Sequence, residues 1–498
     1  MNISLILQMA AEAGPERIGL VCNGRRWTYS ELLRAARGAA AYLSSKHCAY
    51  VALLDESSEA APIALFGAAI AGIPYVPLNY RLADEDLAAL LARIDPACII
   101  GDIDKVSPLT GESTHTCLSR AEFVAAAEAA ADSATGEEIE GEGIAVQIFT
   151  SGTTAAPKAA LLRHANLLGY ILGTVEFCSA NEDDAQLVCV PPYHIAGIST
   201  LLSSVYALRK IVLLPAFDPD NWLQLASSEG VSNAFVVPTM LARVVDRIEA
   251  GVSADLSSLK AIAYGGGRMP TELIEKVLQR FPDTHFTNAY GLTETSSTIA
   301  LLSPQDHRTA QSSDEPAIRA RLGSVGQPLP TVEIEIRDEQ GKQLPAGERG
   351  EIYVRGEQVS GEYRGRTALD ADGWFPTRDA GWMDEGGYLF LTGRADDVIV
   401  RGGENISPGE IEDVLMSHPA IVDAAAVGVP SQEWGEAVGI AIVARPDHAT
   451  PGDEELRKLI KDRLRSSRVP EQIRSLPELP YNEMGKLLRR EIRTLFLD

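Results

Sequence analysis

Short β-rich runs alternate with longer helical patterns along the first half of this chain, and this alternation limits its fold more than any other feature. Val51–Leu54 indicates a strand, Glu59–Ala71 a helix and Tyr75–Pro77 the next strand. Strands that are joined through helices run parallel, because the helix returns the chain along one face of the sheet. The pattern therefore predicts an α/β fold of doubly wound βαβ units, with helices on both faces of a mostly parallel sheet.

The rest of the chain departs from this rhythm in two places. Between Gly323 and Val354, apolar Val332, Ile334 and Ile336 alternate with charged residues, which predicts an antiparallel, β-barrel-like subdomain. A new set of helix and strand patterns begins near residue 394 and predicts a small α+β domain. Because 498 residues exceed what one hydrophobic core supports, we expect separate domains, 1–393 and 397–498.

The composition is that of a folded protein, with 45% hydrophobic and 23% charged residues. The net charge of −25 disfavours general nucleic-acid binding, which needs Lys and Arg to neutralise phosphates. Residues 457–493 are the exception, with eleven Lys and Arg against five Asp and Glu. This stretch indicates either a face for an anionic ligand or an ordinary solvated helix face.

Cellular location is predicted from cysteine usage and from the apolar segments. The six cysteines include no CxxC pair, which favours a reducing cytoplasm and indicates neither a zinc site nor a disulfide framework. The first sixteen residues lack the basic start of a secretory signal and predict a surface helix. The apolar stretch Ala60–Leu78 contains Pro62, Pro74 and Pro77, so it predicts a buried helix and strand and no transmembrane segment.

The strongest single clue to function is a hydroxyl-rich segment, Thr150–Ala160, directly after the apolar strand pattern Ile144–Phe149. Its candidate phosphate-binding residues are Thr150, Ser151, Gly152, Thr153, Thr154 and Lys158. Hydroxyls and backbone N–H groups in such a turn can surround phosphate oxygens, and the lysine adds positive charge. The chain has no GxxxxGK[ST] or GxGxxG motif, so the common nucleotide-binding folds are not indicated. Taken alone, a Ser/Thr-rich turn is more often only a turn.

Six further motifs follow this loop in an order that resembles one family. They are Pro192–Gly197, Tyr290–Glu294, Gly373–Asp379, Gly393–Asp397, Gly402–Ile406 and Asn482–Lys486. Together with Ala71–Ala83 and Trp434–Glu436, they make nearly the whole chain similar to the adenylate-forming (AMP-binding) superfamily. The resemblance is to its acyl-CoA synthetase and fatty-acid–CoA ligase branch.

The resemblance implies a two-step ligase reaction. A carboxylate attacks the α-phosphate of ATP in the presence of Mg²⁺, pyrophosphate leaves, and the acyl group passes to the thiol of CoA or of a carrier protein's phosphopantetheine. Because both partners in the first step are anions, the site must supply positive charge and oriented donors. The resemblance also implies that residues 397–498 are a mobile lid that turns about a hinge at 394–396, with Asp396 at its centre.

The family pattern assigns catalytic roles to Lys486, Thr293, Glu294 and His194. Lys486 would bridge the carboxylate and the phosphate, Thr293 would bond the α-phosphate, and Glu294 would hold Mg²⁺ together with phosphate oxygens. His194 stands at the aromatic position that guards the acid pocket, where it would line the pocket.

The same pattern assigns binding roles around the nucleotide and the acceptor. Adenine would lie along Gly265, Gly266, Gly267, Asn288, Ala289, Tyr290 and Gly291, and the Tyr290 ring could stack on it. Asp379 and Arg394 would bind the ribose, and Gly402 and Gly403 would line the path of the pantetheine arm.

The lack of acidic residues in one region limits which class of carboxylic acid the chain is expected to bind. No Asp or Glu lies between Ala185 and Phe217, the region in which amino-acid-activating relatives place an Asp to pair with the substrate's ammonium. A buried ammonium without a partner is costly, so an α-amino acid is disfavoured. We expect a fatty or aromatic acid.

Four positions depart from the family's usual pattern. Ala155 and Ala159 replace glycines of the phosphate loop, Arg378 replaces the glycine before the ribose Asp, and Asn482 stands where Thr is common. A Cβ at a left-handed backbone position costs on the order of 1 kcal/mol. Three hypotheses therefore stay open: an acyl-CoA ligase, a ligase that loads an acyl carrier protein, and a nucleotide-binding homologue with weakened turnover.

Overall fold

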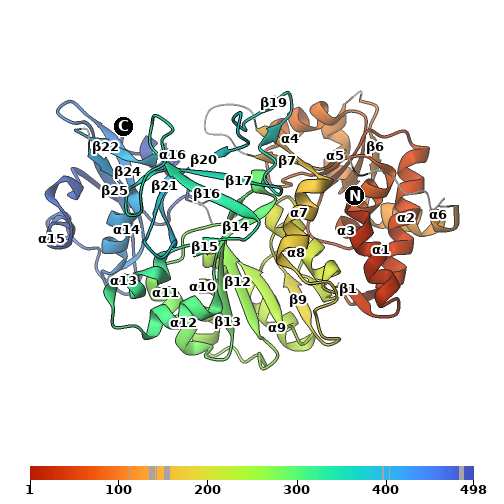
Figure 1. The fold of residues 1–498 in the computed structure, drawn as a ribbon, viewed down its shortest axis with the longest axis horizontal. Coiled ribbons are helices and arrows are strands. Elements are labelled where there is room, and N and C mark those ends of the chain that lie inside the picture. The colour runs from red at the N-terminus through yellow and green to blue at the C-terminus, as the bar shows by residue number, and fades with distance from the viewer. Residues whose placement is uncertain are drawn as a thin grey trace.

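The structure, a computed structural model, describes residues 1–111, 113–133, 141, 143–150, 157–394, 397–402, 404–481 and 487–497. The strands within these residues form four sheets. Figure 1 shows the N-terminal helices at one end of the molecule and the last hundred residues at the other.

The first sheet carries the long parallel run that the alternation predicts. In spatial order its strands are β15 (Gln327–Pro328), β14 (Ser297–Leu302), β13 (His285–Leu292), β12 (Ala261–Gly265), β11 (Asn233–Val236), β9 (Ala185–Val188), β10 (Lys210–Leu213), β1 (Ile18–Cys22) and β2 (Arg25–Thr28). The strands from β13 to β1 run parallel, with Tyr264 opposite Asn288, and antiparallel strands close both edges.

The second sheet is also parallel in its middle. Its order is β19 (Arg366–Thr367), β18 (Glu362–Tyr363), β8 (Lys158–Arg163), β7 (Ile144–Thr150), β4 (Tyr75–Pro77), β3 (Tyr50–Leu54), β5 (Ala97–Gly101) and β6 (Thr116–Leu118). The β7–β8 hairpin turns the chain back at the hydroxyl-rich segment. Strands β18 and β19 come from much later in the sequence and extend this edge.

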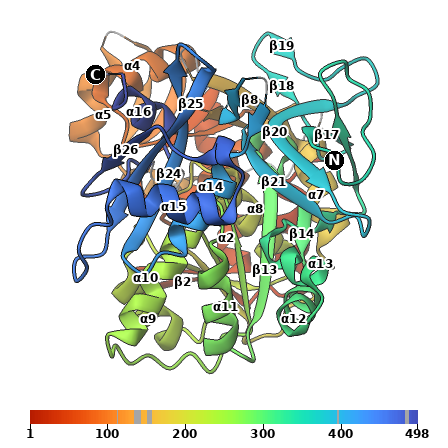
Figure 2. The same cartoon turned by 90° about the vertical axis from the view of Figure 1, so that its left-hand side faces the viewer.

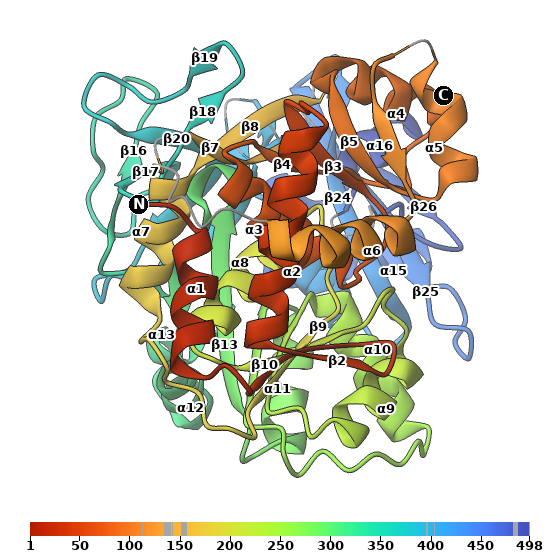
Figure 3. The ribbon, with the colours of Figure 1, turned by 90° about the vertical axis from the view of Figure 1, so that its right-hand side faces the viewer.

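Helices fill the space between the two sheets and cover their outer faces. The shared core joins both sheets to α1 (Ser4–Ala13), α2 (Tyr29–Ser45), α3 (Ala60–Ala71), α7 (His164–Thr174) and α8 (Ile195–Tyr206). The outer face of the first sheet packs on α9 (Pro219–Ser228), α10 (Pro238–Glu249) and α11 (Thr271–Arg280). The outer face of the second packs on α4 (Asp84–Leu91) and α5 (Ile103–Thr110). Figure 3 shows α6 (Arg120–Ala130) lying across α2 and α3.

Local sequence explains where these helices begin and which face they bury. Helix α2 starts with a capping box, in which the Glu31 backbone N–H donates to the Thr28 hydroxyl and the Glu31 carboxylate accepts from the Thr28 N–H. Helix α1 forms at the N-terminus as predicted, with one face buried and its last residues, Glu12 and Ala13, exposed. Ile3, Ile6 and Leu7 are buried in the shared core, because their apolar face packs against the helices between the sheets.

Two smaller sheets complete the fold. The small sheet contains β16 (Val332–Arg337), β17 (Gly350–Gly356), β20 (Phe375–Met383) and β21 (Leu389–Arg394), all antiparallel as the period of two predicts. The C-terminal sheet contains β23 (Glu404–Ile406), β22 (Ile399–Arg401), β25 (Gly435–Ala444), β24 (Ile421–Ser431) and β26 (Gln472–Ser475). The last residue of β21 and the first of β22 lie in different sheets, on either side of residues 395–396.

The C-terminal sheet has its own helices and its own cores. They are α14 (Pro408–Met416), α15 (Asp453–Arg463) and α16 (Arg489–Thr494). Figure 2 shows this part of the molecule in front of the first sheet. The prediction of a large α/β part with a small C-terminal α+β part is therefore confirmed. Within the described residues, no helix is both long and apolar enough to cross a bilayer.

Candidate active site

The candidate site lies along the edge at which the parallel strands of the first sheet end. Because β9, β10, β11, β12 and β13 run in one direction, the residues that follow each of them meet at a single carboxyl edge. In open parallel sheets, ligands bind in the crevice outside this edge. The predicted adenine-side residues fall here, since Gly265 ends β12 and Tyr290 lies near the end of β13.

Glycine is required at the end of β12 for a packing reason. A Cβ on Gly265 would lie 2.2 Å from the carbonyl oxygen of Ala289 on the neighbouring strand. The next residue, Gly266, has φ +75°, a left-handed conformation that favours glycine. Buried Asn288 donates from Nδ2 to the carbonyl oxygen of Ser324 at 3.1 Å. The backbone of Gly265 is thus held close against β13.

Tyr290, Asp379 and Arg394 meet where the first sheet touches the small sheet. The Tyr290 hydroxyl donates to Oδ2 of Asp379 at 2.6 Å, and Arg394 Nη1 lies 3.2 Å from Asp379 Oδ1. Asp379 and Arg394 stand opposite each other in the β20–β21 register. Burial, reinforced by the charge of Asp379, raises the pKa of Tyr290 well above its usual value. The tyrosine therefore stays protonated and serves as a donor. It lies within β13.

The backbone beneath Asp379 is fixed by an irregularity in β20. The buried Thr377 hydroxyl donates to Ile352 O at 2.8 Å and accepts from the Asp379 N–H at 3.1 Å, while Arg394 Nη1 donates to Thr377 O at 3.1 Å. Arg378, which lies between Thr377 and Asp379, has φ +64°. This left-handed conformation gives a physical reason for the glycine of the family pattern, and the chain accommodates an arginine there.

Glu294 lies on a short 3₁₀ turn, Thr293–Thr295, directly after β13. Its Oε1 accepts from the Tyr363 hydroxyl at 2.7 Å, and its backbone oxygen accepts from the N–H groups of Ser360 and Gly361 at 2.8 and 3.3 Å. Burial, together with the charge of Glu294, raises the pKa of Tyr363. Among the described residues no three His, Cys, Asp or Glu side chains gather as a metal site.

The phosphate loop adjoins this turn through the second sheet. Thr150 and Lys158 stand opposite each other at the ends of β7 and β8, and the Thr150 hydroxyl donates to Lys158 O at 3.4 Å. Tyr363, the partner of Glu294, pairs with Ala160 on β8. The predicted residues Ser151, Gly152, Thr153 and Thr154, and the departure at Ala155, lie outside the described residues.

His194 precedes α8, and its environment keeps it neutral. Its Nε2 is buried and has no hydrogen-bond partner within the described part of the chain. Burial lowers its pKa to about 3, and its ring lies 4.3 Å from that of Tyr193. A neutral imidazole with an unpaired buried nitrogen can still hydrogen-bond a ligand.

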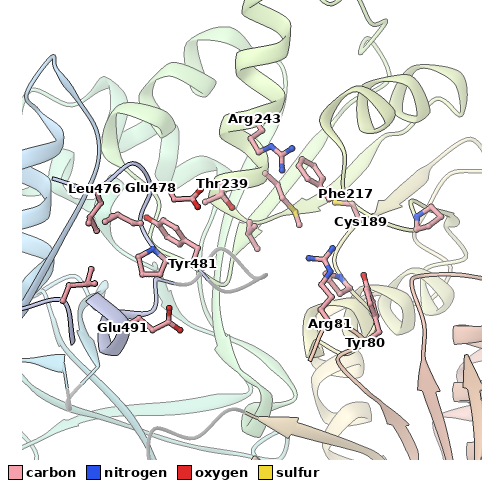
Figure 4. A pocket seen from close by; sticks show the side chains of 18 of the residues that line it. Tyr80, Arg81, Cys189, Phe217, Thr239, Arg243, Leu476, Glu478, Tyr481 and Glu491 are labelled. Atoms are coloured by element: carbon pink, nitrogen blue, oxygen red, sulfur yellow. The ribbon is translucent and has the colours of Figure 1, made fainter. Parts of the chain in front are cut away.

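A cavity of about 1050 Å³ opens beside these residues, between the carboxyl edge and the C-terminal part of the chain (Figure 4). Its lining includes Cys189 after β9, Phe217 after β10 and Thr239 after β11, and on the opposite side Leu476, Glu478, Tyr481 and Glu491. Arg81 and Arg243 add positive charge to the first wall, where Arg243 lies over the Phe217 ring at 5.3 Å. One wall is thus cationic and the other carries carboxylates.

The remaining predicted residues lie elsewhere or outside the described residues. Lys486, Asp396 and Gly403 are outside them. Gly402 forms the turn between β22 and β23 with φ +58°, and its N–H donates to Trp434 O at 2.9 Å. A Cβ on Gly402 would lie 2.9 Å from the Trp434 ring, so this turn packs against the tryptophan.

The structure brings some predicted residues together and adds others. Tyr290, Asp379 and Arg394 form one contact group, whereas Glu294 belongs to a second group with the β7–β8 hairpin. Tyr363 and Arg243 were missed, because a lone tyrosine and an exposed helix arginine give no sequence signal. Arg81 falls within Ala71–Ala83, a segment that already matched the family pattern.

Comparison with known families matches both parts of the chain. A family model described as AMP-binding enzyme matches residues 7–364, and one described as AMP-binding enzyme C-terminal domain matches residues 410–486.

Individual relatives align over nearly the full length. A 2-succinylbenzoate–CoA ligase of Bacillus cytotoxicus is 31% identical over 98% of each chain. A fatty acid–[acyl-carrier-protein] ligase of Streptomyces coeruleorubidus is also 31% identical, over 98% of this chain and 95% of its own. Structures of o-succinylbenzoate CoA synthetase from Bacillus subtilis are 28% identical. The complex with an acyl-adenylate intermediate has a TM-score of 0.83, covering 98% of this chain and 97% of that one. The complex with ATP and magnesium ion has a TM-score of 0.82, covering 99% of each.

Proposed function

We propose, from the premise that this chain belongs to the family of AMP-binding enzymes, that the carboxyl edge of its first sheet is a site for activating carboxylic acids. The chain is an AMP-forming acid–thiol ligase that uses ATP, Mg²⁺ and CoA. An acyl-adenylate forms first, and the acyl group then passes to the thiol. The observation that carries the proposed site is the Asp379 carboxylate, held between Tyr290 and Arg394 beside that edge.

ATP would bind with its sugar against Asp379. The carboxylate can accept hydrogen bonds from both ribose hydroxyls, and Arg394 can donate to the same sugar. Adenine would lie along the backbone of Gly265–Gly267 and β13. Because the Tyr290 hydroxyl is committed to Asp379, this tyrosine also orients the carboxylate. Thr150 to Thr154 and Lys158 would surround the outer phosphates.

Acid activation needs positive charge between two anions. Mg²⁺ would be held by Glu294 and phosphate oxygens, and it would neutralise charge on the phosphates. The Thr293 hydroxyl would bond the α-phosphate, and Lys486 would approach from the C-terminal part to bridge the α-phosphate and the acid. Carboxylate attack then forms the acyl–phosphate bond and releases pyrophosphate.

The acid would bind beside α8, next to His194. Helix α8, Ile195–Tyr206, carries no charged side chain, so it offers no partner for a substrate ammonium. A neutral His194 can hydrogen-bond a substrate without adding charge. These features support an aromatic or fatty acid as the substrate.

The acceptor thiol would enter through the cavity in Figure 4. Arg81 and Arg243 line its cationic wall, and apolar Phe217 and Leu476 line it as well, which suits a pantetheine arm that carries phosphate. In a second arrangement of the domains, Gly402 and Gly403 would line the path of the same pantetheine arm.

Domain motion and location complete the proposal. Residues 1–393 would bind ATP and the acid, 394–396 would act as the hinge at Asp396, and 397–498 would be the lid. The supporting observation is that β21 and β22 belong to different sheets. A cytoplasmic location is supported by the six cysteines, all of which are free thiols.

A second acceptor, an acyl carrier protein, is favoured by the relative from Streptomyces coeruleorubidus that is named for it. The experiment that separates the two acceptors is product analysis by mass spectrometry. The protein is incubated with ATP, Mg²⁺ and a panel of acids that includes benzoate, 2-succinylbenzoate and octanoate, with either CoA or a pantetheinylated carrier protein. We expect AMP, pyrophosphate and an acyl-CoA thioester. A thioester formed only on the carrier protein would show that the carrier protein, and not CoA, is the acceptor. If no thioester forms with either acceptor, the proposed ligase activity is refuted.

A further inference from the structure

An arginine next to the candidate nucleotide loop contacts the C-terminal part of the molecule. Arg268 directly follows Gly265–Gly267, and its Nη1 donates to the carbonyl oxygen of Gly409 at 2.7 Å. Its Nη2 pairs with the carboxylate of Asp413, and Nη1 lies 3.9 Å from Glu412 Oε2. All three partners belong to α14, so a single side chain joins the nucleotide loop to this helix.

Glu412, which also lies near Arg268, continues the network from α14. This buried carboxylate accepts from Arg489 Nη2 at 3.0 Å and from the backbone N–H of Ala426 at 2.8 Å. Arg489 also donates to Ala426 O at 3.2 Å, and its Nε lies 3.8 Å from Asp397 Oδ2. Burial lowers the pKa of Arg489, but the charge and hydrogen bond of Glu412, together with the charge of Asp397, outweigh it, so the pKa is raised.

The network ends at both segments that flank the predicted moving parts. Arg489 begins α16, three residues after Lys486, and Asp397 follows the predicted hinge residue Asp396. The other flank of 482–486 is fixed as well, since Tyr481 bridges to Leu487. An ionic path therefore runs from the nucleotide loop to Arg489, three residues after Lys486.

The two halves of this path differ in energy. Glu412 and Arg489 are mostly buried, and removing one partner of such a pair is strongly destabilising, so changes there would damage the fold. The side chains of Arg268 and Asp413 are 49% and 53% exposed, and exposed pairs contribute little to stability. Arg268 can therefore be changed without unfolding the protein.

We propose that Arg268 is a positioning residue for acid activation, which acts by holding α14, and through it Arg489 at the start of α16, beside the nucleotide loop. This inference rests on the proposed function. Arg268 acts through the C-terminal part, so transfer from a finished acyl-adenylate does not depend on it. Its loss should slow the step that needs Lys486 and leave the second step unchanged.

The test is a comparison of the two half-reactions in Arg268→Ala. We expect acid-dependent pyrophosphate release to fall about 10-fold, the scale of losing hydrogen bonds from a charged donor. The KM for ATP and the transfer of the acyl group from a supplied acyl-adenylate to CoA should both stay within about 2-fold. Asp413→Ala, which removes the other partner, should give the same division between the steps.

A matched control and a rescue separate positioning from a general loss of structure. Arg247→Ala removes a similarly exposed arginine, bonded to Asp220 at 2.7 and 2.9 Å within the N-terminal part, and should change neither step. Arg268→Lys, which keeps a positive donor facing Asp413 and the carbonyl oxygen of Gly409, should restore pyrophosphate release to within about 3-fold of the unchanged protein.

Three results would overturn the inference: an equal loss in both steps, no loss in either, or no rescue by Arg268→Lys in a protein with unchanged thermal unfolding. Failure of the proposed function looks different. In that case the unchanged protein itself releases no pyrophosphate with any acid and transfers no acyl group from a supplied acyl-adenylate.

Discussion

The molecule holds its two groups of candidate residues in different ways. The ribose wall, defined as Tyr290, Thr377, Asp379 and Arg394, is set by strand register and by bonds within neighbouring sheets. The docked face, defined as Arg268, Gly409 and Asp413, depends on one half-exposed side chain. A wall fixed by register serves every step in which the nucleotide is bound. A face joined through an exposed ion pair separates more readily, which suits a contact that serves one step.

The largest loss of activity that would sharpen this comparison is expected on substitution of Lys486. The docked face would position this lysine for acid activation. Lys486→Ala should lower acid-dependent pyrophosphate release by roughly 10²–10³, the scale for removing one preorganised electrostatic donor. Transfer from a supplied acyl-adenylate should be spared. Single-turnover measurement of each step checks this, and an equal loss in both would contradict the separation of wall and face.

Asp379→Asn tests whether a change in the ribose wall weakens both steps of the reaction. The amide removes a charge that Tyr290 and Arg394 both bond, so kcat/KM for ATP should fall by about 10- to 100-fold. Because an acyl-adenylate carries the same ribose, its transfer to CoA should weaken as well. If steady-state kinetics showed a loss in ATP use alone, the wall would serve only one step and the comparison would break.

A smaller effect is expected from His194, whose pKa is lowered to about 3 by burial. Its unfolded value near 6.5 is higher, so the unfolded state binds more protons below pH 6.5 and stability falls as the pH decreases. His194→Phe removes this term. Relative to the unchanged protein, its free energy of unfolding should improve by about 1 kcal/mol between pH 7.5 and 5.5. Parallel denaturant titrations at both values measure it, and a constant difference would mean that the imidazole is not buried neutral.

The smallest effect concerns Arg378, the residue in the left-handed conformation beside Asp379. Arg378→Gly should raise the free energy of unfolding by at most about 1 kcal/mol, because glycine adopts φ +64° without a Cβ penalty. Its distant pair with Glu351, at 3.8 Å, contributes little. Pyrophosphate release should stay within about 2-fold. A large rise in that rate would show that Arg378 distorts the ribose wall.

The elements of the fold could be predicted because their signals are local. The parallel run followed from strand and helix patterns such as Val51–Leu54 and Glu59–Ala71, and the small sheet from the period of two around Ile334. The burial of α1 could not be predicted in this way. Whether a short apolar helix lies at the surface or between two sheets depends on partners that are distant in the sequence.

The candidate site shows the same limit more sharply. Spacing alone could not place the Tyr290 hydroxyl on Asp379, 89 residues later. The basic stretch 457–493 indicated either an anion site or a solvated face. Many of its cations instead form ion pairs within the C-terminal part, as Arg468 does with Glu404 and Glu410. Charge content gave no sign of this, because pairing depends on the tertiary fold.

The account rests on a reversible acyl-adenylate, and its most direct test is acid-dependent exchange of labelled pyrophosphate into ATP by the unchanged protein without CoA. Exchange requires that the acid and ATP react to form a bound acyl-adenylate and pyrophosphate, and that this step runs backwards. We predict exchange with at least one aromatic or fatty acid and none without acid. Absence of exchange with every acid, or exchange only after CoA is added, would contradict the account.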